Sequence, residues 1–408
     1  MTRSFRFAAL AAALALNATA ASTAELPFDQ VEAGRYQSIL GDCAGCHTAP
    51  GGAPFAGGVA LDTPFGKLVA ANITPDAETG IGAWSEADFR NAMKSGVGHN
   101  GKRLYPAMPY PAYSLMSDRD VGDLWAYLRS VQPVKNAIVS NQLPFPVNIR
   151  LLLAGWNWLN FSPADFKENP QKSAEWNRGA YIVQGAGHCA TCHSPKSVLG
   201  ADKGGMTGAV LQNWLAPNIT GNLHDGVGAW SADDIVAYLK TGSNKTSVAS
   251  GPMAEVIEAS TSKMNDADLR AVAVYLKDLP ASDKAPAPIA ASDPAMRAGA
   301  AIYGVTCSAC HGGDGSGQAQ LFPRLAGNAA VQQGDPTTLI RVVLAGSQGA
   351  GTHFAPTTPA MPSLAWRLND TQIADVLTYV RNTWGNAAPP VTPGAVGALR
   401  QAVKDGGS

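Results

Sequence analysis

The chain has 408 residues, of which 46% are hydrophobic and 15% charged, and its formal net charge is −1. This composition is typical of a soluble globular protein, and the length fits about two to four domains of about 150 residues each. The near-neutral charge gives no case for nucleic-acid binding. Six cysteines in this length are too sparse for a disulfide framework.

The N-terminal segment 1–24 has the pattern of an export signal. Arg3 and Arg6 form a positive start, an uninterrupted apolar run follows at 7–16, and small residues precede a predicted cleavage near Ala24. The apolar run is too short to cross a bilayer, which needs about 20 residues. A short N-terminal anchor helix is the alternative interpretation. No later segment is apolar enough to span a membrane.

A pentapeptide, Cys-x-x-Cys-His, occurs three times and uses every cysteine of the chain. Two thiols on one helical turn can each add to one vinyl group of a haem, and the following histidine can then bind the iron from below. A single copy could also be a redox-active cysteine pair or half of a zinc site. Three copies, each with its histidine, instead predict three covalently bound haem c groups. The residues are Cys43, Cys46 and His47, Cys189, Cys192 and His193, and Cys307, Cys310 and His311.

The sequence around each pentapeptide predicts an all-α chain of three tandem cytochrome c domains, each a small helical fold around one haem. The phrase Ala71-Asn-Ile-Thr through Gly-Ala-Trp-Ser85 returns at 217–231, which indicates internal duplication, whereas the third copy lacks it. The predicted boundaries are 25–134, 174–280 and 292–386 for the domains, 135–173 and 281–291 for the linkers, and 387–408 for a tail holding at most a short amphipathic helix.

Each domain is predicted to end in a helix that packs across the helix before its pentapeptide. The N-cap residues of these last helices are Ser117, Asn265 and Asn369, and Asp120, Asp268 and Gln372 follow three positions later as capping boxes. Apolar residues then recur with helical spacing on one face. Small residues in the preceding helices would permit close approach; these are Gly34, Gly179 and Gly299.

The two linkers differ in composition. Residues 281–291 are rich in proline and alanine and predict an extended spacer. Residues 143–161, within the first linker, are dense in apolar and aromatic groups. They could pack against their own domains, or they could form a patch that docks on a partner protein or on the membrane surface.

The sixth iron ligand decides whether such a haem carries electrons or reacts with small molecules. Each predicted domain has one methionine beside proline between its pentapeptide and its last helix, and these are the expected axial ligands: Met108, Met253 and Met361. Met116 and Met264 lie at helix starts and are expected to be structural. The other histidines share no place in the repeat, so they are expected to lie on the surface or beside an iron ligand without binding the iron: His99, His188, His224 and His353. Trp84 and Trp230 do share a place, either at a haem edge or in plain core packing.

Taken together, these features resemble the three-haem cytochrome c subunit of bacterial membrane-bound dehydrogenases. The resemblance covers nearly the whole mature chain and rests on motifs such as GDCAGCHTAPGG, YPAMPY, GHCATCHSPK, GPMAEV and PAMPSLAWRL. It implies an electron-transfer subunit without catalysis of its own. Its partner would be a flavin dehydrogenase for gluconate, sorbitol, fructose or glucose, or a quinoprotein alcohol dehydrogenase, with or without a small third subunit.

The same resemblance implies that electrons pass to membrane ubiquinone on the periplasmic side of the bacterial cytoplasmic membrane. It also implies the axial pairs His47/Met108, His193/Met253 and His311/Met361. The chain departs from the family because it has no clear C-terminal anchoring helix, so peripheral attachment is expected. Two other functions remain open at this point, a free-standing periplasmic electron shuttle and a haem peroxidase or reductase with one open site.

Overall fold

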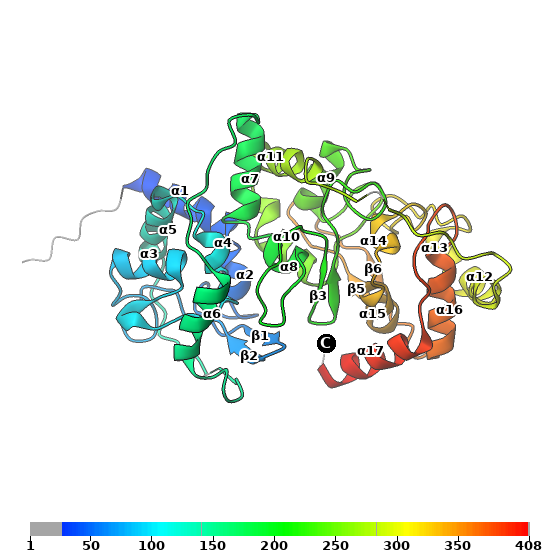
Figure 1. Cartoon of the computed structure of the whole chain (residues 1–408), viewed down its shortest axis with the longest axis horizontal. Helices are drawn as coiled ribbons and strands as arrows, with labels where there is room; N and C mark the ends of the chain where they lie inside the picture. Colours follow the sequence, from blue (N-terminus) through cyan, green and yellow to red (C-terminus); the bar gives the residue numbers. More distant parts are fainter. Residues whose placement is uncertain (1–26, 140, 283, 407–408) are drawn as a thin grey trace, which may run out of the picture.

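The computed structural model describes residues 27–139, 141–282 and 284–406, so the predicted export signal lies outside the described residues. Helices joined by loops dominate, and three groups of elements succeed one another along the long axis of the molecule (Figure 1). We call them the first unit (α1–α5), the second unit (α7–α11) and the third unit (α12–α17). The prediction of a helical fold is confirmed, with three short antiparallel hairpins that were not predicted.

The first unit and the segment after it contain α1 (Phe28–Leu40), α2 (Cys43–His47), β1 (Ala60–Thr63), β2 (Gly66–Val69), α3 (Glu86–Ser95), the 3-10 turn η1 (His99–Gly101), α4 (Tyr110–Tyr113), α5 (Asp118–Ser130), η2 (Arg150–Leu152) and α6 (Leu153–Asn160). The second unit contains α7 (Ala174–Gln184), α8 (Ala190–His193), β3 (Ala209–Leu211), β4 (Trp214–Ala216), α9 (Ala232–Thr241), α10 (Pro252–Ala259), η3 (Thr261–Lys263) and α11 (Asp266–Lys277).

The third unit contains α12 (Pro294–Thr306), α13 (Ser308–His311), α14 (Ala329–Gln332), α15 (Thr337–Ala345), β5 (Ser347–Gln348), β6 (Ala360–Met361), α16 (Asp370–Val380) and α17 (Pro393–Gly406). The hairpins pair β1 with β2, β3 with β4 and β5 with β6. They were not foreseen because strands of two to four residues give too short an alternation to recognise.

Each unit is built on one close helix pair: α1 with α5, α7 with α11, and α12 with α16. The predicted glycines make this packing possible, because a Cβ on any of them would lie between 1.8 and 2.2 Å from a carbonyl oxygen of the facing helix. The contacts are Gly34 on Asp123, Gly179 on Ala271, and Gly299 on Asp375. The predicted apolar face of each last helix is largely buried in the core.

The last helices begin where the sequence predicts, but only one of the three capping boxes forms completely. Ser117, Asn265 and Asn369 each accept a hydrogen bond from the backbone three residues on. The return bond is made only by Gln372. The side chains of Asp120 and Asp268 instead accept hydrogen bonds from tyrosines of the neighbouring unit. The prediction of capping boxes at these two helices was therefore wrong.

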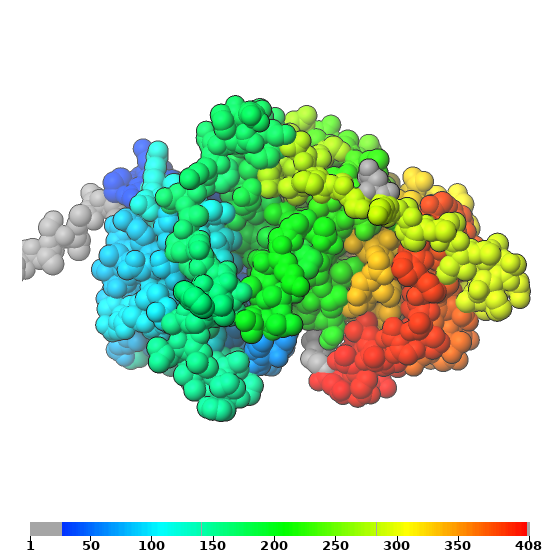
Figure 2. Space-filling model, in the orientation of Figure 1, coloured from blue at the N-terminus to red at the C-terminus, as the bar shows by residue number. Residues whose placement is uncertain are grey.

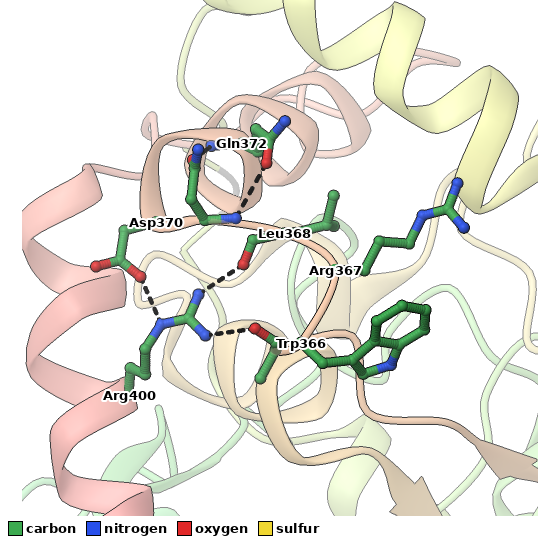
Figure 3. Close-up of a pocket in the computed structure, with 8 residues that line it drawn as sticks. Trp366, Arg367, Leu368, Asp370, Gln372 and Arg400 are labelled. Carbon is green, nitrogen blue, oxygen red and sulfur yellow. Dashed lines mark hydrogen bonds and ion pairs between the residues drawn. The ribbon is translucent and has the colours of Figure 1, made fainter.

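The tail contains a longer helix than predicted, and this helix packs against α15 and α16 of the third unit. Val396 of α17 is fully buried in the core. Arg400 anchors the helix, donating to Asp370 Oδ1 at 2.7 Å and to the carbonyl oxygens of Ala365 at 2.9 Å and Leu368 at 2.8 Å (Figure 3). Among the described residues, no helix combines the length and the apolar content needed to cross a membrane.

The segment 143–161 packs with one face and exposes the other. Leu153 is buried, and Asn157 accepts a hydrogen bond from Tyr110 at 2.6 Å. Phe145 and Trp158 are 80% and 83% exposed, and Leu151, Leu152 and Leu159 are also exposed. Figure 2 shows the segment, in blue-green, on the surface of the molecule. The segment therefore packs in part against its own unit, and docking of its exposed face on a partner protein or on the membrane surface remains a prediction.

Candidate haem sites

Each pentapeptide forms a single helical turn that follows a long helix, directly in the third copy and after a short link in the first two. In the second and third copies the histidine amide donates to the carbonyl of the first cysteine at 3.0 Å, as in an α-helix. This turn places both cysteines and the histidine on one short rigid element, α2, α8 or α13. The spacing is the one that double attachment of a haem requires.

The three histidines of the pentapeptides are held in the same way. Nδ1 lies 2.6 Å from the Ala71 carbonyl oxygen for His47, 2.7 Å from that of Pro217 for His193, and 3.0 Å from that of Pro323 for His311. A carbonyl oxygen can only accept, so Nδ1 carries the proton and donates it. Nε2 is then left with a free lone pair, which is the arrangement of a metal-binding histidine.

Burial lowers the pKa of His47, of His193 and of His311. The imidazoles are therefore neutral at physiological pH, and only a neutral imidazole can bind a metal.

The repeated Asn-Ile-Thr phrase explains how two of these carbonyls are positioned. Asn72 Oδ1 accepts hydrogen bonds from the amide of Thr74 at 2.9 Å and from its hydroxyl at 2.8 Å. Asn218 and Thr220 repeat this turn with the same distances. The turn follows Ala71 or Pro217, so the phrase fixes the acceptor of the histidine proton. The repeat of the phrase is visible in the sequence, but its role depends on the contact with the histidine, which is 24 residues away in both units.

The expected methionine ligands differ from the other methionines in burial and setting. Met116 and Met264 are 1% and 4% exposed and belong to the core, as predicted. Met108, Met253 and Met361 are only partly buried at the edges of core clusters. Met361 lies in β6, whose backbone pairs with Ser347. Their role as axial ligands remains a prediction.

Comparison with known proteins agrees with this geometry. Residues 31–132 and 296–384, which contain the first and third pentapeptides, match the cytochrome c family model. The chain is 40% identical to the gluconate 2-dehydrogenase cytochrome c subunit of Pantoea cypripedii, over 91% of this chain and 89% of the relative. It is 38% identical to the cytochrome c subunit of the quinone alcohol dehydrogenase of Komagataeibacter europaeus, over 97% and 89%.

A third relative is the fructose dehydrogenase cytochrome subunit of Gluconobacter japonicus, 36% identical over 91% of this chain and 82% of the relative. The chain belongs to this family of dehydrogenase cytochrome c subunits. Cytochromes c carry covalent haem through thioether bonds to cysteine.

The cysteines of this cytochrome c subunit fit haem attachment better than redox chemistry. None of the six forms a disulfide bond with another cysteine. Burial in apolar surroundings raises the pKa of Cys43 and Cys189 to about 12, and that of Cys46 and Cys307 to about 11. A redox-active cysteine pair needs the opposite shift, toward a stable thiolate.

The packing of the third unit also fits an added macrocycle. Its apolar residues divide into two clusters, and Cys307 packs against one while Met361 packs against the other. Ile302 and Leu339 contact both clusters. Cys307 would attach a haem at the edge of one cluster, and its expected ligand Met361 lies at the edge of the other. In the first unit Cys43 and Met108 already border the same cluster.

The remaining histidines take separate positions, as expected. His99 lies 3.0 Å from Asp88 and stacks on Trp84, with ring centres 6.2 Å apart. Trp84 and Trp230 both border the main core cluster, which agrees with plain packing. His188 directly precedes the second pentapeptide, and its surroundings are described below.

Asp42, which precedes the first pentapeptide, gives the subunit a pH-dependent stability. Burial raises its pKa from 3.8 to about 7, and its Oδ1 has no hydrogen-bond partner. A carboxyl group whose pKa is raised on folding stabilises the fold while protonated and loses this contribution as pH rises from about 4 to about 7.

We expect Asp42→Asn to remove most of this dependence. The free energy of unfolding of the parent should fall between pH 4 and pH 7, by up to about 4 kcal/mol for three pK units, and that of the variant should fall much less. Denaturant titration of the haem-loaded chain at both pH values measures this. Asp29→Asn, at an exposed position, is the control, and parallel curves for parent and Asp42→Asn would contradict the prediction.

Proposed function

We propose that this chain is an electron-transfer subunit whose three units are cytochrome c domains with one covalent haem c each. It receives electrons from the catalytic subunit of a sugar or alcohol dehydrogenase and passes them to membrane ubiquinone. The observation that carries the proposal is the histidine geometry repeated three times, with Nδ1 bound to a backbone carbonyl and Nε2 free. A redox centre needs a ligand held in one orientation in both oxidation states.

At each haem site, different residues of the chain attach the haem and orient the histidine ligand. The cysteine pairs hold the macrocycle, and the backbone carbonyls of Ala71, Pro217 and Pro323 orient the proximal histidines. The bound haem supplies one-electron chemistry, and a thioether ligand raises its potential.

Proline borders all three expected methionine ligands, with Pro362 after Met361, and a glycine turn adds to this in the third unit. Met108 precedes Pro109 and Met253 follows Pro252. Gly346 adopts a left-handed conformation, where a Cβ would lie 2.7 Å from the Met361 carbonyl oxygen.

We further propose that the mature chain acts on the periplasmic side of the cytoplasmic membrane and attaches there peripherally. The exposed apolar face of 143–161, with Phe145 and Trp158 projecting from it, supports docking on the catalytic subunit or on the membrane surface. The relatives named above are each the cytochrome subunit of a dehydrogenase, which supports a fixed catalytic partner rather than a free shuttle.

Isolation of the native complex tests this function. We expect a dehydrogenase catalytic subunit to co-purify with the chain from mild detergent extracts, and reduction of the haems on addition of that enzyme's substrate. Intact mass should show three added haems per chain. A chain that elutes alone and stays oxidised would favour the free shuttle, and a haem that binds peroxide or carbon monoxide in the native protein would favour an enzyme with one open site.

A further inference from the structure

A reciprocal pair of tyrosines fastens the first unit to the second. Tyr36 of α1 donates to Asp268 Oδ2 at 2.8 Å and accepts from the Asn265 amide at 3.2 Å, at the start of α11. Burial acts to raise the pKa of Asp268, but hydrogen bonds from Arg178 and Tyr36 outweigh it and hold this pKa below its usual value. The carboxylate is therefore charged, and its hydrogen bonds are of the stronger, charge-assisted kind.

The mirror contact uses the equivalent residues of the other unit. Tyr181 of α7 donates to Asp120 and accepts from the Ser117 amide at 2.9 Å, at the start of α5. Each tyrosine thus occupies the first turn of the other unit's last helix, where the return bond of the capping box would otherwise be made. Two such reciprocal contacts fix both the distance and the rotation between the units.

The residues just before the pentapeptides of the two units meet inside this interface. His188, the residue before Cys189, places Nε2 at 3.3 Å from the carbonyl oxygen of Gly41, which lies two residues before Cys43. Tyr113 donates to the same oxygen at 3.0 Å, and its ring packs edge-on against the His188 ring with centres 5.6 Å apart. Because a carbonyl oxygen can only accept, the His188 Nε2 carries the proton of this bond.

Other contacts bring further parts of the two haem sites together. Helix α10, whose first turn carries Met253, contacts α2, which carries the first pentapeptide. Ser260, just after α10, donates to the Ile39 carbonyl at 2.6 Å. The axial methionine proposed for the second haem therefore lies on an element that touches the attachment helix of the first.

His188 is held in this position at a conformational cost. Its φ of +36° is in the left-handed region, which residues with a Cβ adopt at a cost of about 1–3 kcal/mol. Burial lowers its pKa, so the ring stays neutral with a single proton to donate. The third unit has no counterpart, because α12 continues to Thr306 and the pentapeptide follows directly.

We propose that His188 is a positioning residue that links the first and second haem sites, through its hydrogen bond to Gly41, for direct electron exchange between them. This inference rests on the proposed function. One electron passes from the ferrous iron of one site to the ferric iron of the other; no bond forms or breaks, and the Nε2 proton stays on His188. The covalent and hydrogen-bonded path runs from Cys189 through His188, Gly41 and Asp42 to Cys43.

Internal electron exchange in the haem-loaded full chain tests this link. His188→Phe keeps the packing on Tyr113 but has no proton to donate, so we expect a several-fold slower relaxation after flash photoreduction of the partly reduced protein. His188→Gln, whose amide can donate to Gly41, should restore most of the rate. Tyr113→Phe is the matched control, because it removes the other donor to the same oxygen without breaking the path to Cys189.

Visible spectra, redox titrations and intact mass are recorded for each variant. Full haem content with an exchange rate unchanged in His188→Phe, or lowered equally in Tyr113→Phe, would overturn the inference. Absence of covalent haem from the parent would instead overturn the proposed function. If His188→Phe does not assemble its haems, the electron-exchange rate of His188→Gln is compared with that of His188→Leu. Equal rates in these two variants would overturn the inference.

Discussion

Replacing Met361 by alanine is expected to remove the sixth ligand of the haem iron in the third unit and to lower the reduction potential of that haem. Met361 lies in β6 directly before Pro362, and its carbonyl oxygen lies close to Gly346. Its backbone is fixed by pairing with Ser347. No other side chain is predicted to replace the thioether, so water or a small ligand would fill the position. Because axial ligands set haem potentials over about 0.8 V, we expect a fall on the order of 100 mV at this centre.

Redox titration and the near-infrared methionine-to-iron band measure this change. The band should lose the contribution of one of three haems, and carbon monoxide should bind the reduced variant. Met296→Ala is the matched control, since Met296 is a buried core residue of the same unit; it should cost about 2–5 kcal/mol of stability and leave the band intact. A Met361→Ala spectrum and titration equal to those of the parent would show that the third iron has another ligand.

Features that depend on neighbours in the chain were predictable from the sequence. The pentapeptides needed no tertiary information, because both thiols and the histidine share one helical turn. The starts of the last helices were predictable for the same reason, since Ser117, Asn265 and Asn369 each cap the backbone three residues away.

Features that depend on distant partners were not predictable. Asp120 and Asp268 read as local capping partners, but Tyr181 and Tyr36 compete for them from another unit. The role of His188 depends on Gly41, which is 147 positions away. The Pro323 carbonyl that holds His311 lies outside any repeated phrase. In each case the deciding atom comes from a contact that no local pattern encodes.

Gly299→Ala is expected to be the most destabilising single methyl addition in the third unit. Its Cβ would lie 2.2 Å from the Asp375 carbonyl oxygen and 2.6 Å from the Tyr379 Cβ. Both obstacles belong to the body of α16 rather than to a flexible side-chain end, so α12 and α16 would have to separate. Overpacking of a core commonly costs about 1–3 kcal/mol. Because the added methyl group would meet backbone atoms at this distance, we expect the loss in free energy of unfolding to lie at or above the upper end of that range.

Gly304→Ala in the same helix separates this steric effect from helix propensity. A Cβ at Gly304 would meet no atom within 4 Å, so alanine should stabilise α12 by about 0.5–1 kcal/mol through its higher helix propensity. Denaturant unfolding of both variants, followed through haem absorbance and far-ultraviolet circular dichroism, gives the two free energies. Opposite signs are expected, because only the first methyl group enters the helix contact. Stabilisation by both substitutions would mean that α12 and α16 do not approach as closely in the haem-loaded protein as the repeat of Gly34, Gly179 and Gly299 requires.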